Sequence, residues 1–498
     1  MWTEIGHLGV WIRQKDWLTL CRESYRSWAW PWAWNVGIVV LLSSAAHQNL
    51  KPYPIELETT VEVLSEEQEE TVLFQENNQQ QQSAEDSTTA LAMDLHLSPK
   101  FILALVLIIF WTVFWFIHII AIIYGYRKLH RRRATPLDDE PGVTGVSILK
   151  PLVGSPMDPN LMTNLETFFT MNYPKFELLF CVQDESDPSI MIVNQLQKKH
   201  PHIDCQLFTG GKMVGVNPKI NNMQPGYCAA KHELLLVSDS SLLMKEDTLS
   251  DMVQHMTPDV GIVHQMPFTV DRKGWPAVLE KVFFGTGHAR MYLFLGFLDA
   301  MGIAVHCCTG MSCLMRKKIL DQAGGLSEFG KYLAEDYFFA KYIQDAGWGI
   351  RISSQPAWQN SGTCKVKNFL SRIERWCKLR MAMVPHTIIL EPLSECIMLG
   401  LVSAWAAATL FQADYLSFFL THTLVWFCSD WLMLIIVNNG APPFSKFEFV
   451  ISWLFRETSA LFIFLHANWD PVISWRNNSY KLNWKGIAEP VNTRGSVI

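Results

Sequence analysis

Charged residues are scarce in this sequence, and the scarcity restricts what the chain can be. Asp, Glu, Lys and Arg make up 18% of its 498 residues, against roughly 25% in an average soluble domain. Hydrophobic residues reach 49%, with 20 Trp and 29 Phe, so part of the chain is expected to lie in a membrane. The sequence also lacks a long basic stripe, and its net charge is −6; no nucleic acid partner is expected.

Paired cysteines are also missing. The 11 Cys are scattered, without a CxxC pair or a Cys/His cluster at zinc spacing, which argues against a disulfide framework and a zinc site. We interpret five of them as small buried residues in a reducing compartment. These are Cys181, Cys205, Cys307, Cys308 and Cys313.

One long apolar run predicts a membrane helix. Residues 101–124 (FILALVLIIFWTVFWFIHIIAIIY) carry no formal charge, and a run of this length crosses a hydrocarbon core of about 30 Å as a helix. Basic residues follow it at Arg127, Lys128 and 131–133. By the positive-inside rule, these place the following polypeptide in the cytosol.

Residues 1–95 are predicted to be an N-terminal extension. The apolar stretch 34–46 follows several basic residues, which is typical of a signal-peptide core or a short signal anchor. The next segment is acidic at 62–70 and Gln-rich at 79–82, so we expect disorder there. A chain beginning at Met93 is expected to keep its activity, because the long helix and every candidate site residue lie beyond it.

From residue 146 onward, short apolar runs alternate with amphipathic stretches, as in ELLFCVQD followed by SIMIVNQLQKK. Such alternation predicts crossover connections and a mostly parallel sheet with helices on both faces. Near-continuous apolar strands such as 233–237 (ELLLV) fit burial on both faces. The sequence therefore predicts a cytosolic α/β domain at 135–385.

Three further apolar segments lie within 388–468, at 396–411, 415–437 and 447–466, and 469–498 is expected only as a tail. Asp430 interrupts the second segment, and Arg456 with Glu457 interrupts the third. Charge inside a membrane costs at least about 2.5 kcal/mol per group, so these side chains must face a partner, a cavity or the interface. Interfacial helices without a functional charge and an acceptor-site role both fit the pattern. Basic residues at 365–380 again indicate cytosol.

Two acidic residues close predicted strands, where parallel sheets bind ligands. Asp184 ends ELLFCVQD and Asp239 ends HELLLVSD. A nucleotide sugar presents a nucleoside and a diphosphate whose charge needs a divalent cation, so Asp184 suits the nucleoside and Asp239 the metal. Taken singly, each also fits a turn or a helix cap.

A third acidic site opens an amphipathic stretch, at Glu335 and Asp336 in YLAEDYFFAK. Glycosyl transfer with inversion needs one carboxylate to take the proton of the acceptor hydroxyl, and Asp336 is our candidate base. The alternative is an acidic helix N-terminus favoured by the helix dipole.

The segment SRIERWCKLR places Arg372 and Arg375 one helical turn apart, beside Trp376. Both arginines can then reach one diphosphate, although a basic amphipathic helix lying on anionic lipid has the same pattern. His264, after another strand, is a weaker donor-site candidate, since a buried core histidine is the default interpretation. Lys212 and Lys219 are placed in loops near the open end of the sheet, with a weak phosphate role.

Four motifs in order give a specific resemblance: VQD at Asp184, SDSS at Asp239, AEDYF at Asp336 and RIERW at 372–376. They match the inverting glycosyltransferases of GT-A fold. The surrounding sequence, including SILKPLVG, NPKINNMQPGY, CCTGMSCLMRK and NWDPVISWRNNSY, resembles ceramide glucosyltransferases over about 93–480. The resemblance implies transfer of glucose from UDP-glucose to ceramide at a Golgi membrane, with the catalytic domain facing the cytosol.

By the same resemblance, Asp184 contacts the uridine, Asp239 takes part in metal and diphosphate binding, and Asp336 accepts the proton. Arg375 and Trp376 help to hold donor and acceptor. His264 is matched to a family histidine linked to the donor. The family implies a divalent cation, Mg²⁺ or Mn²⁺, and because SDSS lacks a second acid, the cation is expected to be weakly held.

Rival interpretations remain at this stage. A dolichyl-phosphate sugar synthase or a processive polysaccharide synthase shares the fold and the Asp motifs, but Arg at position 372 and the short membrane tail argue against a polymer-extruding channel. A membrane scaffold with an inactive glycosyltransferase fold is the non-enzyme alternative. It predicts the loss of an acid, and all four motifs are intact.

Overall fold

The computed structural model describes residues 98–131, 143–154, 158–362, 364–475, 478–483 and 485–491. The expected signal anchor and polar segment in 1–95 lie outside these residues. The described chain divides into two compact units. The larger comprises 106–404 and the residues from 416 on, and the smaller comprises 98–105 and 405–415. The sheet and the polar clusters considered below belong to the larger unit.

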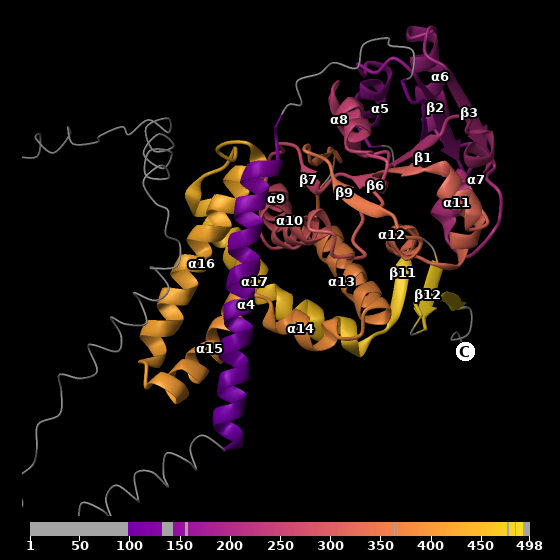
Figure 1. Ribbon diagram of the computed structural model, residues 1–498. Coiled ribbons are helices and arrows are strands. Elements are labelled where there is room, and N and C mark those ends of the chain that lie inside the picture. The colour runs from indigo at the N-terminus through magenta and orange to yellow at the C-terminus, as the bar shows by residue number, and fades with distance from the viewer. Residues whose placement is uncertain are drawn as a thin grey trace, which may run out of the picture. The chain divides into compact units, whose positions relative to one another are not determined.

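A seven-stranded sheet has the order β3-β2-β1-β4-β8-β6-β9 (Figure 1). Neighbouring strands are parallel, except that β8 runs antiparallel to both β4 and β6. The predicted α/β class with a mostly parallel sheet is therefore confirmed, and β8 is the strand of this sheet whose direction departs from the parallel arrangement. The strands are β1 (Val146–Leu152), β2 (Phe176–Val182), β3 (Cys205–Thr209), β4 (Leu234–Ser238), β6 (Val260–His264), β8 (Ser312–Arg316) and β9 (Gly349–Ile352).

Helices cover both faces of this sheet, because successive residues of a buried strand point to opposite sides. Ile148 of β1 packs in one apolar core with Leu165 and Val193, and its neighbour Leu149 packs in another with Met223 and Phe339. The first core is formed by α5 (Leu161–Phe169), α6 (Ser189–Lys199) and α8 (Thr248–Gln254). The second is formed by α7 (Pro218–Ala229), α11 (Lys317–Gln322), the 3₁₀ turn η1 (Leu326–Lys331) and α12 (Glu335–Asp345).

A second, three-stranded sheet and a set of helices connect this domain to the apolar segments. The strands lie in the order β5 (Leu242–Leu243), β10 (Ala357–Gln359) and β7 (Pro267–Thr269). The helices are α9 (Trp275–Gly285), α10 (Gly287–Ala300), α13 (Val366–Met383) and α14 (Thr387–Leu393). Helix α17 (Lys446–Trp469) packs against α9 and α13, so helices that precede the apolar segments share an interface with one of those segments.

Three described helices are long and apolar enough to cross a membrane: α4 (Pro99–Lys128), α16 (Tyr415–Asn438) and α17 (Lys446–Trp469). A fourth, α15 (Cys396–Phe411), is apolar but shorter. These bounds agree with the apolar segments predicted from the sequence. A capping box starts α17, since Ser445 Oγ accepts from Glu448 N at 3.2 Å while the Glu448 carboxylate accepts from Ser445 N at 2.8 Å.

The region expected only as a tail contains a small antiparallel sheet of β11 (Val472–Trp475), β12 (Asn478–Leu482) and β13 (Ala488–Val491). Its Ile473 and Tyr480 pack with Leu333, just before α12. Tyr480 also donates to the carbonyl of Val216 at 3.4 Å. Residues 473–480 are therefore packed against the two loops that precede α7 and α12.

Candidate active site

One cavity of about 1120 Å³ opens where β1 and β4 end, and it gathers most of the predicted site residues. Its polar part is lined by side chains from α7, α12, α13 and the loop after β4. It continues between α9, α10, α13, α14 and α17, where the lining is largely apolar. The polar lining includes Lys219, Asp239, Glu335, Asp336, Arg372, Arg375 and Trp376.

A buried lysine lies between two of the acids. Lys219 Nζ is 3.0 Å from Asp239 Oδ1 and 3.1 Å from Glu335 Oε1, and it donates to the Gly310 carbonyl at 2.7 Å. Burial lowers the pKa of Lys219, but the two carboxylates raise it well above its usual value. We call Lys219, Asp239, Glu335 and Asp336 the sheet-edge cluster. Lys219 was expected in a loop, but this residue lies in the first turn of α7.

Asn217 explains why this lysine is fixed. Its side chain caps α7 by accepting from Lys219 N at 2.8 Å and Ile220 N at 3.2 Å. The same amide donates to Glu335 Oε2 at 2.9 Å. The cap therefore joins the starts of α7 and α12 and aligns Lys219 with the acid that opens α12.

Asp336 is held by backbone amides. Its Oδ2 accepts from Gly310 N at 2.7 Å and its Oδ1 from Tyr337 N at 2.9 Å. Burial and the adjacent Glu335 carboxylate raise the pKa of Asp336 to about 6, because both disfavour its charged form. A carboxyl group with this pKa, at a fixed position in a cavity, is suited to accept a proton near neutral pH.

Arg372, Arg375 and Trp376 of α13 all line the cavity. Arg372 donates to Gln359 Oε1 at 3.3 and 3.2 Å, whereas the Arg375 guanidinium lies 5.8 Å from the centre of the Trp475 ring. Burial lowers the pKa of both arginines, but Arg remains charged. Both side chains thus point into the protein, which favours ligand contact over the alternative of a helix lying on lipid.

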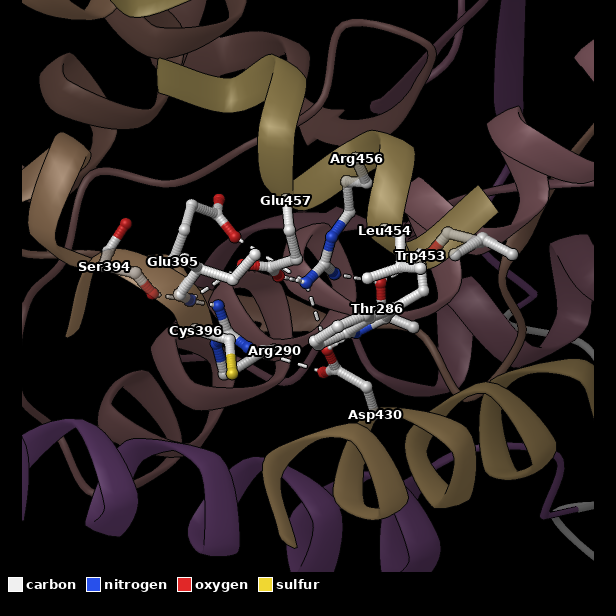
Figure 2. Close-up of polar contacts among 12 residues, drawn as sticks. Thr286, Arg290, Ser394, Glu395, Cys396, Asp430, Trp453, Leu454, Arg456 and Glu457 are labelled. Atoms are coloured by element: carbon white, nitrogen blue, oxygen red, sulfur yellow. Dashed lines mark hydrogen bonds and ion pairs between the residues drawn. The ribbon is translucent and has the colours of Figure 1, made fainter. Parts of the chain in front are cut away.

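The charges predicted to need partners in the apolar segments have them. Arg456 Nη2 is 3.0 Å from Asp430 Oδ2 and also bonds Glu457 (Figure 2). Trp453 Nε1 donates to Asp430 Oδ2 at 2.8 Å, and Arg290 Nη1 of α10 lies 3.5 Å from Asp430 Oδ1. We call Arg290, Glu395, Asp430, Arg456 and Glu457 the membrane-side cluster. All but Asp430 line the same cavity as the sheet-edge cluster.

Comparison with known proteins identifies the family. A family model described as "Glycosyl transferase family 21" matches residues 113–488. The chain belongs to glycosyl transferase family 21. Among curated proteins it is similar to ceramide glucosyltransferase 1 of Caenorhabditis elegans, at 44% identity over 78% of this chain and 82% of the relative. Ceramide glucosyltransferase 3 of the same organism is 42% identical over 80% of this chain and 85% of the relative.

A solved structure matches more distantly. The mannosyltransferase PcManGT from Pyrobaculum calidifontis, in complex with GDP-Man and Mn²⁺, is 17% identical over 74% of this chain and 99% of that one, with a TM-score of 0.43.

Two predicted residues of this family 21 chain are not among those that line the cavity. Asp184 follows β2 and is exposed, and its Oδ1 accepts from Ser186 N at 2.8 Å and from Ser186 Oγ at 2.7 Å. These hydrogen bonds lower the pKa of Asp184. Strand β1 lies between β2 and β4, so Asp184 is about 10 Å along the sheet edge from Asp239. Asp184 therefore follows a different strand from Asp239 and lies outside the sheet-edge cluster.

His264 is also outside the lining. It ends β6, is 2% exposed, and packs on the Tyr292 ring with centroids 5.8 Å apart. Burial lowers its pKa to about 3, so it is a neutral core histidine in this structure.

Three histidines that sequence reasoning did not single out line the cavity: His288, His306 and His386. His288 of α10 stacks on Trp376 with centroids 5.7 Å apart and an interplanar angle of 26°. Its Nδ1 is buried without a hydrogen-bond partner among the described residues. His288 stands in the apolar run of α10 and belongs to no recognisable motif. Only its contact with Trp376 of α13, which the sequence does not show, points to the cavity.

The family 21 residues present fit a cation shared with a diphosphate better than a metal held by protein alone. The described part of the chain contains no group of three or more His, Cys, Asp or Glu side chains arranged around a metal position. Asp239 offers one carboxylate whose side chain is 34% exposed, with one oxygen on Lys219. One or two carboxylates plus substrate phosphates is a common set of ligands for Mg²⁺.

Proposed function

We propose that this family 21 enzyme transfers glucose from UDP-glucose to the primary hydroxyl of ceramide, with inversion, to give glucosylceramide. One observation carries the proposal: a single cavity joins the acids at the edge of the sheet to an apolar space between helices that contact α17. A water-soluble nucleotide sugar and a membrane lipid can both reach such a cavity from their own phases. The 42–44% identical ceramide glucosyltransferases support the choice of substrates.

In this proposal Asp336 is the general base. Its carboxylate takes the proton of the ceramide hydroxyl while that oxygen bonds to the anomeric carbon, and the bond from that carbon to the UDP oxygen breaks. The Gly310 and Tyr337 amides fix the carboxylate, so little reorganisation is needed at the moment of transfer.

The donor would lie along the sheet edge. Arg375 and Lys219 supply positive charge near the leaving diphosphate, and Asp184 is placed to meet the nucleoside. A Mg²⁺ or Mn²⁺ ion, when bound, would neutralise phosphate charge, and Asp239 would hold it. With only one protein carboxylate available at that position, we expect weak binding of the ion in the absence of UDP-glucose.

The lipid chains would occupy the apolar end. Its walls come from α9, α10, α14 and α17, and include Phe283, Phe294, Leu390, Leu461 and Phe464. Burial of hydrocarbon against such walls contributes about 25 cal/mol per Å², so acceptors with longer chains should bind more tightly.

We further propose a Golgi membrane location, which rests on the family resemblance, with the catalytic domain in the cytosol, which rests on the charge pattern after 101–124 and before 396–411. Protease added outside sealed microsomes should then cut within 135–385, while a tag at residue 60 stays protected. Protection of the catalytic domain would contradict this orientation.

The reaction itself is tested with microsomes that express the chain, supplied with UDP-[¹⁴C]glucose and a short-chain ceramide. Label should appear in a lipid that co-migrates with glucosylceramide. Microsomes without the chain are the control, and dolichyl phosphate replaces ceramide in a parallel arm. Transfer to dolichyl phosphate but not to ceramide would favour the rival synthase.

A further inference from the structure

The membrane-side cluster contains one carboxylate that the protein leaves largely unused. Asp430 is bound by Arg456 and Trp453 at 3.0 and 2.8 Å. Glu457 bonds Arg456, and its Oε2 accepts from Ile397 N at 3.2 Å, in the first turn of α15. Both acids therefore have strong partners within the protein.

Glu395 has none of comparable strength. Its closest ionic partner is Arg456 Nη2, at 3.7 Å from Oε2, and Oε2 is buried without a hydrogen-bond donor among the described residues. The side chain is 26% exposed and lines the cavity. A buried carboxylate oxygen without a hydrogen bond is costly, so Oε2 of Glu395 is suited to accept from a ligand in the cavity.

A donor with spare capacity lies beside it. Arg290 reaches Asp430 Oδ1 only at 3.5 Å and the Ser394 carbonyl only at 3.4 Å, although a guanidinium carries five N–H groups. In Figure 2, Ser394, Glu395 and Arg290 lie together at one side of the cluster. The cavity lining thus includes both an acceptor, Glu395, and a donor, Arg290, at the membrane-side cluster.

This pairing selects for a particular ligand chemistry. An anion would be repelled by the Glu395 carboxylate, and a pure hydrocarbon would offer its Oε2 no hydrogen-bond donor. A neutral group that carries an N–H or O–H donor together with a carbonyl acceptor satisfies both. The amide and secondary hydroxyl of a sphingoid lipid are such a group.

We propose that Glu395 and Arg290 form a recognition site for the amide and secondary hydroxyl of the lipid acceptor, with Glu395 accepting from one of those donors. The inference rests on the proposed function, because it assigns a site for the acceptor of that reaction. The site positions the acceptor and sets specificity, while the proton is removed elsewhere, at Asp336.

The test compares three acceptors at saturating UDP-glucose: ceramide, its 3-deoxy analogue and its N-methylamide analogue. The enzyme should prefer ceramide by about tenfold or more over at least one analogue, as expected for a lost hydrogen bond to a charged group. In Glu395→Met, kcat/KM for ceramide should fall about tenfold through KM. The preference over that analogue should disappear, and the KM for UDP-glucose should be unchanged.

Glu374→Met is the matched control. Glu374 is 25% exposed and ion-paired to Lys378 at 2.7 Å, so the change in chemistry and exposure is nearly the same, but it is not among the residues that line the cavity. It should leave the preference intact. Should Glu395→Met fail to fold, Glu395→Gln keeps the shape and removes the charge, and it should show a smaller loss of the same preference.

Four results would overturn the proposal: an equal loss with all three acceptors, an unchanged preference in both Glu395 variants, loss of the preference in Glu374→Met as well, or no preference in the parent enzyme. A parent enzyme that does not glucosylate ceramide at all would instead remove the proposed function, so the two failures are distinguishable.

Discussion

The sheet-edge cluster and the membrane-side cluster both contain buried carboxylates, but those carboxylates have different partners. Asp336 accepts from two backbone amides, and its pKa is raised to about 6 by burial and by Glu335. Asp430 instead bonds the Arg456 guanidinium and an indole N–H. Neutral backbone donors leave the proposed base free to exchange a proton, whereas the Arg456 cation favours the charged form of Asp430 and links its helix to α17.

The two clusters also differ in how they are assembled along the chain. The sheet-edge cluster is drawn from the ends of elements in one domain, at 219, 239, 335 and 336. The membrane-side cluster takes its residues from α10, from the position just before α15, and from within α16 and α17. Damage to the first is therefore expected to reduce rate, and damage to the second is expected to reduce stability.

The largest effect on rate is expected at Asp336. Asp336→Asn keeps the shape and can still accept one backbone hydrogen bond, but it cannot take a proton. Turnover should fall about 10² to 10⁴-fold, the usual contribution of a general base, with normal folding and membrane insertion. Activity within threefold of the parent would remove Asp336 from this role.

The largest effect on stability is expected at Asp430. Asp430→Asn leaves Arg456 buried with one partner fewer, which typically costs about 3 to 5 kcal/mol, so the thermal unfolding midpoint in detergent should fall clearly. Asp345→Asn is the control, since its pair with Lys341 is about half exposed and is worth about 1 kcal/mol or less. Equal midpoints for the two variants would contradict the structural role of the membrane-side cluster.

A smaller loss is expected at Arg375. Arg375→Lys keeps the positive charge but loses the planar fork that meets two phosphate oxygens. We expect at least a tenfold loss in kcat/KM for UDP-glucose, about 1.4 kcal/mol, with unchanged membrane association. Near-parental kinetics would instead favour the alternative that α13 is a basic helix lying on lipid.

The pH dependence of the reaction sharpens the same comparison. Only the ionised form of Asp336 accepts a proton, so kcat/KM should be level above about pH 6 and should fall about tenfold per unit below it. At pH 5 the expected loss is roughly tenfold relative to pH 7. A rate that stays level down to pH 5 would show that the base has an ordinary carboxyl pKa or is another group.

Much of this arrangement was predictable from sequence because it depends on local patterns. The alternation of apolar and amphipathic runs predicted the parallel sheet, and long apolar runs predicted α4, α15, α16 and α17 to within a few residues, despite the charges inside α16 and α17. Asp239 and Asp336 were found because acids at strand ends and helix starts fall at the ligand-binding edge. The structure brings both to one cavity.

What sequence did not give depends on contacts between distant segments. The charges at 430 and 456 required partners, but nothing local identified Arg290, 140 residues before Asp430. The ion pair of Lys219 with Glu335 was not predicted, because Glu335 comes from another helix, far along the chain. His264 was a candidate because it ends a predicted strand, a position that sequence patterns identify. His288 was not, because the sequence does not show which face of α10 lies against Trp376.

The configuration of the new glycosidic bond tests the central claim most directly. The claim is that one base, Asp336, drives a single displacement at the anomeric carbon. Purified enzyme, UDP-glucose with its α-linked glucose, and a short-chain ceramide are incubated together, and the anomeric proton of the lipid product is examined by NMR. The account predicts a β-linked glucosylceramide. An α-linked product, or no transfer to ceramide, would contradict it.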